Sequence, residues 1–262
     1  TQYMYTAIAL ENAQAMGEIA AAAHADATVV IAPLSTAITP KRLPPFYQPL
    51  DQKTLLEEMY ALSGLPCLDS MSVLLPIGEA AYYRSDHHWT ADGAKAVYET
   101  LCGMWGITPK TNVQRLWIDG FYGAYYAKVP RPFFPADTFT FDEPAGVTLE
   151  IRGETMPRLL DEQLLKERDK YSAILYGNPA RSTLYGPGEG VLFVVKDSFA
   201  NALIPLLAQH FARVEVFDPR YAPEPIPEAY AASGAEKMLF IHGLTTLLNE
   251  RALILQTGWE AE

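Results

Sequence analysis

Two short polar motifs combine the side chains that acyl-transfer chemistry requires. One is Asp86-His-His-Trp89 and the other is Lys196-Asp-Ser198, and together they supply a serine, a histidine and an aspartate. The apolar run Val191–Val195 before the second motif predicts a buried strand, and helical periodicity follows both motifs. Sites in open α/β sheets lie at the carboxyl ends of strands, in loops that lead into helices. Both motifs are therefore candidates for a catalytic site.

Ser198 is the candidate nucleophile because of its position in the chain. A serine between a buried strand and a helix lies on a sharp turn, with its hydroxyl at the edge of the sheet. Its own N–H is then at the start of the helix, where an oxyanion is stabilised. The alternative is that Ser198 only caps the helix, which is a common role for serine at this place.

Asp86 and His88 are the candidate acid and base because they are two residues apart. In an extended segment such side chains point to the same side, so the carboxylate can fix the imidazole tautomer. The other ring nitrogen is then left to accept a proton from a serine. If the segment already turns at this point, His87 would be the base instead.

A metal site is the alternative use of an Asp-His-His string. Manganese-dependent phosphoesterases carry such a string, but they also need an Asp-x-Asp pair, which this sequence lacks. His24, His210 and His242 stand singly and are interpreted as structural or solvated. The serine mechanism requires neither a metal nor another cofactor, and none is expected.

Short β-branched runs that alternate with helical patterns predict the fold. We expect a three-layer α/β/α sandwich with a mainly parallel sheet, formed by one domain over residues 1–262. A crowd of aromatic, glycine and proline residues at about 112–157 predicts a β-hairpin-rich insertion. The strands are expected at 28–31, 66–69, 173–176, 191–195, 214–217 and 238–241, and the main helices at 6–24, from Asp51, from Thr90 and at 158–170.

Composition excludes some classes of function. The net charge of −11 repels nucleic acid and anionic lipid at long range, so no nucleic-acid partner is expected. No apolar run approaches the roughly 20 residues of a membrane span, and no signal peptide is visible in the chain. The fifteen tyrosines fit either a carbohydrate-facing surface or a well-packed core. Cys67 and Cys102 are either a disulfide or two separate buried thiols.

Longer blocks around the two motifs resemble a known family. Tyr83–Ala94 resembles the signature of the DHHW protein family, and Val195–Asn201 followed by Phe217–Tyr221 resembles its second signature. The order and separation agree from about Ala27 to Leu248. That family is similar to the SGNH-hydrolase-like domains of the alginate O-acetylation proteins AlgJ and AlgX, which supports the expected fold.

The resemblance implies roles for individual residues. Asp86 would be the orienting acid, His88 the general base and Ser198 the nucleophile. The segment from Lys196 also resembles a Gly-Asp-Ser-Leu block, with lysine in place of glycine, which puts the turn geometry in doubt. Further roles are implied for an oxyanion pair, Gly177 and Asn178, and for substrate-binding residues, His87, Trp89, Arg84 and Arg220.

Each of these further roles has a plainer alternative. Gly177-Asn178 precedes a proline and fits an ordinary turn. Arg84 and Arg220 have many acidic residues with which to form salt bridges. The aromatic cluster Trp117–Tyr126 is either a sugar-stacking platform or the packing of a hairpin.

The resemblance implies a serine-dependent O-acyl (acetyl) esterase or acyltransferase that acts on carbohydrate. Its substrate would be an acylated carbohydrate or a cell-envelope polysaccharide, and a membrane-bound partner would donate the acyl group. The location implied is extracytoplasmic, at the cell surface or secreted. The alternative is a catalytically degenerate domain of the same fold, which binds glycan or a partner protein without chemistry.

Overall fold

The central sheet is built from the short β-branched and aliphatic runs of the sequence. In the computed structural model, which describes residues 2–257, eight strands have the order β2-β1-β10-β8-β9-β7-β5-β6. The strands from β2 to β9 in this order are parallel, and β7, β5 and β6 continue the sheet in antiparallel fashion. Their bounds are β1 (Ala27–Ala32), β2 (Cys67–Leu68), β5 (Thr148–Ile151), β6 (Glu154–Thr155), β7 (Arg181–Tyr185), β8 (Val191–Lys196), β9 (Arg213–Phe217) and β10 (Lys237–Gly243).

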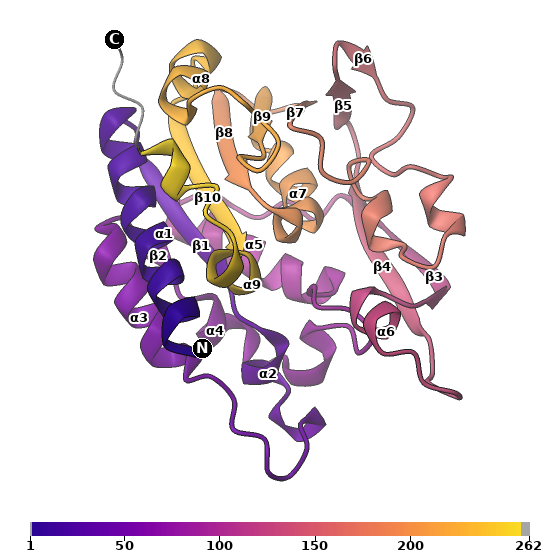
Figure 1. Cartoon of the computed structure of the whole chain (residues 1–262). Helices are drawn as coiled ribbons and strands as arrows, with labels where there is room; N and C mark the ends of the chain where they lie inside the picture. Colours follow the sequence, from indigo (N-terminus) through magenta and orange to yellow (C-terminus); the bar gives the residue numbers. More distant parts are fainter. Residues whose placement is uncertain (1, 258–262) are drawn as a thin grey trace.

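Helices cover both faces of this sheet and form the outer layers (Figure 1). One layer consists of α1 (Gln2–Ala22), α3 (Gln52–Ser63), α8 (Ile226–Ser233) and α9 (Leu244–Asn249). The other consists of α4 (Ser70–Leu74), α5 (Ala91–Met104) and α7 (Ile204–Ala208). Strand β1 shows why the sheet is buried on both faces, since Val29 packs in one core and Val30 in the other. The predicted three-layer α/β/α fold is confirmed.

Two predicted helix starts have the expected caps. The side chain of Asp51 accepts a hydrogen bond from the N–H of Thr54 at the start of α3. Thr90 accepts one in the same way from the N–H of Gly93 at the start of α5. Since the capping residue Thr90 comes two residues after His88, this cap fixes the end of the first polar motif.

The segment at 112–157 contributes to two sheets. Strands β3 (Val113–Phe121) and β4 (Asp137–Pro144) pair with each other, apart from the main sheet, with α6 (Ala124–Lys128) between them. Strands β5 and β6 instead extend the edge of the main sheet through β7. Figure 1 shows the β3–β4 pair and α6 together at one side of the molecule.

Two expected elements are wrong. Residues 158–170 form only a 3₁₀ turn, Leu164–Lys166, because the ammonium of Lys170 binds the carbonyls of Leu165 and Glu167, at 2.7 and 3.2 Å. Residues 173–176 are not a strand: a 3₁₀ turn occupies Tyr171–Ala173, and the next residues turn with positive φ. Their apolar side chains are buried by this turn and not by a sheet. Strand β7 and helix α8 were not predicted.

The remaining short elements are helix α2 (Ser35–Ile38) and 3₁₀ turns at Pro40–Arg42, Gly78–Ala81, Ser198–Ala202 and Ile254–Gln256. Pro205 stands in the first turn of α7, so it begins this helix and does not kink it. Cys67 and Cys102 are both free thiols. Within residues 2–257, no helix has the length and apolar character needed to cross a membrane.

Candidate active site

Ser198 lies on a turn that its neighbour Asp197 fixes. One carboxylate oxygen of Asp197 accepts the N–H of Phe199 at 2.9 Å, and the other accepts the N–H of Gly243, at the end of β10, at 2.8 Å. Asp197, and not Ser198, is therefore the cap of the 3₁₀ turn that follows β8. The hydroxyl of Ser198 is left for other partners, and its N–H bonds to no other described residue.

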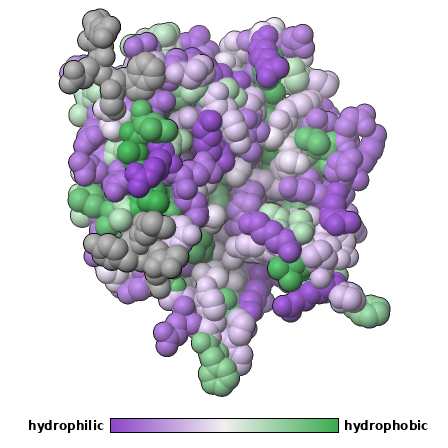
Figure 2. Space-filling model, in the orientation of Figure 1, coloured by the Kyte–Doolittle hydropathy of each residue, from purple (hydrophilic) through white to green (hydrophobic). Residues whose placement is uncertain are grey.

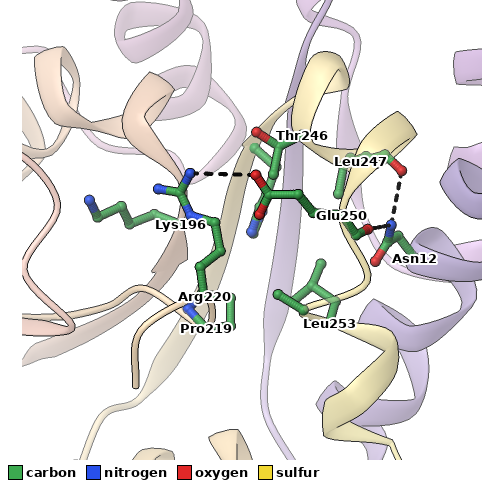
Figure 3. Close-up of a pocket in the computed structure, with 10 residues that line it drawn as sticks. Asn12, Lys196, Pro219, Arg220, Thr246, Leu247, Glu250 and Leu253 are labelled. Carbon is green, nitrogen blue, oxygen red and sulfur yellow. Dashed lines mark hydrogen bonds and ion pairs between the residues drawn. The ribbon is translucent and has the colours of Figure 1, made fainter. Parts of the chain in front are cut away.

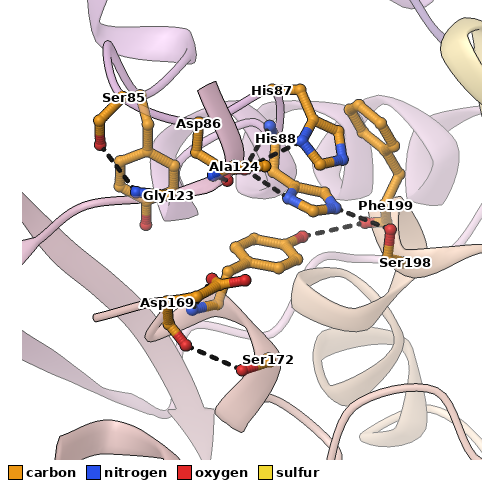
Figure 4. A network of polar contacts seen from close by, with 12 residues as sticks. Ser85, Asp86, His87, His88, Gly123, Ala124, Asp169, Ser172, Ser198 and Phe199 are labelled. Atoms are coloured by element: carbon orange, nitrogen blue, oxygen red, sulfur yellow. Dashed lines mark hydrogen bonds and ion pairs between the residues drawn. The ribbon is translucent and has the colours of Figure 1, made fainter. Parts of the chain in front are cut away.

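The two polar motifs meet in one chain of hydrogen bonds (Figure 4). The ring of His88 lies between Asp86 and Ser198: Nδ1 is 2.6 Å from Oδ1 of Asp86, and Nε2 is 2.7 Å from Oγ of Ser198. Since an ionised carboxylate can only accept, Nδ1 carries the proton in this assignment and Nε2 accepts from the serine. Asp86 and His88 are only 1% and 6% exposed, so water competes little for these bonds.

Backbone N–H groups hold the carboxylate of Asp86 in place. Oδ1 accepts the N–H of His88 at 2.9 Å, and Oδ2 accepts the N–H of Ala124 at 2.7 Å. Ser85 is fixed in turn by Asp137 on β4, whose Oδ2 is 2.7 Å from its backbone nitrogen and 2.6 Å from its hydroxyl. The β3–β4 segment thus supports the acid of the site, a role that local sequence patterns did not reveal.

Two aromatic rings fix the orientation of His88. Tyr171 stacks on its imidazole, with ring centroids 3.7 Å apart and planes 6° apart, and Phe199 packs at 4.9 Å. Tyr171 lies between the residues that were expected to form a helix, 158–170, and those expected to form a strand, 173–176. No pattern in the sequence pointed to this residue.

The charges of the site agree with its geometry. Although burial opposes ionisation, the charge and hydrogen bond of His88 and the N–H of Ala124 hold the pKa of Asp86 well below its usual range. Burial, together with the charge of His88, lowers the pKa of His87 to about 4, so His87 is neutral at pH 7. The buried carboxylate is therefore in the state that stabilises an imidazolium at His88.

His87 does not take the place of the base. Its Nδ1 is 3.6 Å from Asp86, and its ring packs beside His88 with centroids 3.9 Å apart. About a quarter of its side chain is exposed, and it faces the rings of Tyr125 and Phe199. Because His87 lies at the rim of the site, its contact with a substrate stays a prediction.

The other expected substrate contacts have partners inside the protein. Trp89 is fully buried and packs edge-on against Phe199, so it cannot contact a substrate. Arg84 binds Asp137 at 3.0 Å but remains partly exposed beside the site. Arg220 forms a two-pronged ion pair with Asp218, at 2.8 and 2.7 Å, and is largely buried. Trp89 and Arg220 are thus structural, because burial and pairing leave them nothing to offer a substrate.

Only one residue of the expected oxyanion pair, Gly177 and Asn178, has a donor that an oxyanion could use. The N–H of Gly177 donates to the carbonyl of Ile174 at 3.2 Å, so it is not available to an oxyanion. The side-chain oxygen of Asn178 accepts from Lys196 at 2.8 Å and from Asn201 at 3.3 Å. The amide nitrogen Nδ2 of Asn178 has no other partner among the described residues. Among the described residues, Nδ2 of Asn178 and the N–H of Ser198 are therefore both free to donate.

Asp86, His87 and His88 each offer a ligand atom within 4.8 Å of the others. Within residues 2–257 this is the one group of three such side chains. A cation bound there would compete with the bonds of His88 to Asp86 and Ser198, which use both ring nitrogens. This donor set fits proton transfer better than metal binding.

A groove of about 310 Å³ lies beside the triad. Arg84 and Ser85 line it from one side, and Lys128, Arg131 and aromatic residues of the β3–β4 segment line it from the other. Its lining includes three cations and no acid. The predicted aromatic platform, Trp117–Tyr126, serves two purposes. Phe121 is buried in the hairpin core, whereas Tyr125 and Tyr126 line the groove together with Phe134.

Part of the chain matches the model of a known protein family. Residues 9–113 match a family described as the SGNH hydrolase-like domain of the acetyltransferase AlgX; this segment includes Asp86 and His88 but not Ser198. A search of curated proteins finds no match to the sequence.

Three solved structures have the same fold across nearly the whole chain. A DHHW family protein from Eubacterium siraeum has 20% identity and a TM-score of 0.79, covering 97% of this chain and 90% of that chain. Bacillus cereus PatB1, solved with a sulfonyl adduct, has 18% identity and a TM-score of 0.71, with coverage of 92% and 90%. The O-acetyltransferase domain of Pseudomonas putida AlgJ has 12% identity and a TM-score of 0.57, with coverage of 95% and 87%.

The fold is that of these solved structures, and residues 9–113, less than half of the chain, match the SGNH hydrolase-like domain family. The resemblance to a DHHW family protein and to the AlgJ and AlgX domains is confirmed, as a likeness of fold and, over residues 9–113, of sequence.

Proposed function

We propose that this protein is a serine-dependent O-acetyl esterase or O-acetyltransferase that acts on carbohydrate. The single observation that carries the proposal is the unbroken hydrogen-bonded chain from Asp86 through His88 to Ser198, with distances of 2.6 and 2.7 Å. A degenerate binding domain has no need for a serine hydroxyl bound to a buried imidazole that a carboxylate orients. The complete chain therefore favours catalysis over the binding alternative.

The proposed reaction has two acyl-transfer steps. Oγ of Ser198 attacks the ester carbonyl as its proton moves to Nε2 of His88, and Asp86 stabilises the imidazolium that forms. The tetrahedral oxyanion accepts hydrogen bonds from the N–H of Ser198 and from Nδ2 of Asn178. The same proton then passes to the leaving alkoxide, and an acetyl ester remains on Ser198. In the second step, water or a sugar hydroxyl gives its proton to Nε2 of His88 and attacks the acetyl carbon. The ester bond to Oγ of Ser198 then breaks as His88 returns the proton to this oxygen, which restores the free serine.

The groove beside the triad supports a carbohydrate substrate. Sugars bind proteins through aromatic faces combined with polar side chains, and this groove offers Tyr125 and Tyr126 together with Lys128 and Arg131. Figure 2 shows a mainly hydrophilic face with apolar side chains in scattered patches, which fits a polar ligand. By analogy with the AlgX-type domain, we extend the proposal to a cell-envelope polysaccharide, an extracytoplasmic location and a membrane-bound acyl donor.

The proposal is tested by labelling the protein with a fluorophosphonate. Such a reagent forms a stable adduct only with an activated serine, and we expect one adduct per chain, mapped by peptide mass spectrometry to Ser198. Release of acetate from an acetylated glycan, or its transfer to a sugar hydroxyl, then separates the esterase from the transferase. A folded protein that forms no adduct and binds glycan would contradict catalysis and favour the binding domain.

A second prediction concerns the cations of the groove. Lys128 and Arg131 are exposed and pair with no acid in the described part of the chain. Changing both to glutamine is expected to lower kcat/KM for an acidic acetylated glycan by about 2- to 30-fold, as for two exposed ion pairs. The loss should shrink at high salt because such pairs are screened.

The matched control is Arg152→Gln, an exposed arginine on the turn between β5 and β6. Turnover of 4-nitrophenyl acetate, which is too small to fill the groove, should not change in any of these variants. An equal loss of kcat/KM for the acidic glycan and for 4-nitrophenyl acetate would mean that the substitutions disturb the fold. They would then not act through substrate binding in the groove.

A further inference from the structure

Lys196 is a fully buried lysine at the carboxyl end of β8, two residues before Ser198. Its ammonium group is 2.8 Å from Oδ1 of Asn178, 3.0 Å from Oδ1 of Asn201 and 3.5 Å from Oδ2 of Asp218. These three acceptors come from three different segments of the chain. Through these contacts, one ammonium group links the loop before β7, the 3₁₀ turn of Ser198 and the end of β9.

These contacts fix the loop that contains Asn178 against the turn of the nucleophile. Asn201, one turn after Ser198, donates through Nδ2 to the carbonyl of Gly177 at 3.0 Å and to Oδ1 of Asn178 at 3.3 Å. Because Lys196 and Asn201 both bind Oδ1 of Asn178, the amide is held in one orientation. Its free nitrogen Nδ2 then points away from the lysine.

Within residues 2–257, no other cation contacts all three acceptors of the ammonium group of Lys196. Arg220 is held by Asp218 and reaches toward Glu250 at 4.0 Å, whereas Lys196 extends away from Glu250 (Figure 3). The cavity between them has a volume of only about 10 Å³, the room of about one water molecule. Burial makes each lost hydrogen bond costly here, because at most about one water molecule has room to replace it.

We propose that Lys196 is a positioning residue: its ammonium group holds Asn178 and the turn of Ser198 in the geometry that the acyl-transfer step needs. This inference rests on the proposed function, and it gives a reason for a lysine where a Gly-Asp-Ser-Leu block would have glycine. It also predicts a pH dependence, because the neutral amine has only two N–H groups for three acceptors.

The pH at which this occurs follows from the surroundings of Lys196. Burial, helped by the charge of Arg220 and opposed by Asp218 and Asp197, lowers the pKa of Lys196 to about 8. His242 also faces it, but burial lowers the pKa of His242 to about 4. Although burial opposes it, the bond to Asp218 raises the pKa of Arg220. Neither neighbour changes its charge near pH 8, so a transition there reports Lys196.

The experiment measures the rate of fluorophosphonate labelling from pH 6 to pH 10. We expect the rate of the wild-type protein to fall above pH 8, with an apparent pKa near 8, while thermal unfolding shows that the fold is retained. In Lys196→Arg, the fall should disappear up to pH 10, because the guanidinium stays charged. In Lys196→Met, the rate at pH 7 should be about 10- to 100-fold lower, the effect of one lost hydrogen bond to a charged group.

Asn178→Ala keeps the test valid if arginine does not fit at position 196. The rate of this variant should be low and independent of pH above 7, and adding Lys196→Met should lower it little further. Lys110→Met is the matched control, since Lys110 is an exposed lysine that donates to the carbonyl of Gln209. An alkaline fall that persists unchanged in both Lys196→Arg and Asn178→Ala would overturn the inference, as would a flat wild-type profile.

A second measurement separates this inference from the proposed function. In Ser198→Ala, which has no nucleophile, the NMR signal of the Asn178 side-chain amide should shift with a pKa near 8. The signal is identified by its loss in the Ser198→Ala, Asn178→Ala double variant. A shift without any labelling of the wild type would reject the proposed function and leave the link from Lys196 to Asn178 intact. Labelling of the wild type with a flat profile and no shift would reject the role of Lys196 alone.

Discussion

Changing His88 to alanine is expected to lower the turnover of an acetyl ester by about 10⁴- to 10⁶-fold, with the same loss in Ser198→Ala. Nε2 of His88 is 2.7 Å from Oγ of Ser198, and within residues 2–257 no other side chain hydrogen-bonds this hydroxyl, so the ring is placed to take the proton. Because the serine and the histidine act as a unit, the double variant should lose little more than either single variant. The measurement is kcat/KM for 4-nitrophenyl acetate, with labelling by a fluorophosphonate as a second readout.

Two other histidines provide the comparison. His87→Ala should lower turnover by no more than about tenfold, because His87 only packs beside the base and lies 3.6 Å from Asp86. His24 is exposed beyond the end of α1, so His24→Ala should have no effect. A loss in His87→Ala as large as in His88→Ala would make His87 the base and would contradict the tautomer assigned here.

Local patterns made Asp86, His88 and Ser198 candidates for a physical reason, although they left His87 as an alternative base. A buried β-branched run must end in a turn, and polar side chains in that turn have no packing role. The spacing of Asp86 and His88 then limits which of them can touch. The same logic predicted the caps at Asp51 and Thr90, since each depends on residues only three positions away. Information within a few residues was sufficient for these features.

The rest of the site depends on contacts between distant segments. Ala124 reaches Asp86 across 38 residues, and Asn178 reaches Lys196 across 18 residues. Tyr171 stacks on His88 from a 3₁₀ turn. The apolar residues that follow this turn have the sequence pattern of a strand but do not form one. Arg84 binds Asp137 across 53 residues, and no pattern in the sequence chooses this acid among thirty-one. Apolar character predicts that a side chain is buried, but not which segment buries it.

Gly123→Ala is expected to abolish most of the activity although residue 123 touches no substrate. A Cβ atom at Gly123 would lie 2.1 Å from Oδ2 of Asp86 and 2.3 Å from its Cβ, closer than any real contact. The carboxylate must then move, which breaks its bonds to the N–H of Ala124 and to His88. We expect turnover to fall by about 10²- to 10⁴-fold, approaching the effect of removing the orienting acid.

A double-mutant cycle tests whether Gly123→Ala lowers the activity by displacing the carboxylate of Asp86. If it does, Gly123→Ala should add little to Asp86→Asn, since both remove the same restraint on His88. Gly103→Ala in α5 is the matched control: its Cβ would meet no atom within 4 Å, so activity should be unchanged and stability higher by up to about 1 kcal/mol. Thermal unfolding of Gly123→Ala separates displacement of the carboxylate from loss of the fold. Full activity in a folded Gly123→Ala protein would mean that the orientation of His88 does not depend on Asp86, and that a serine and a histidine alone perform the chemistry.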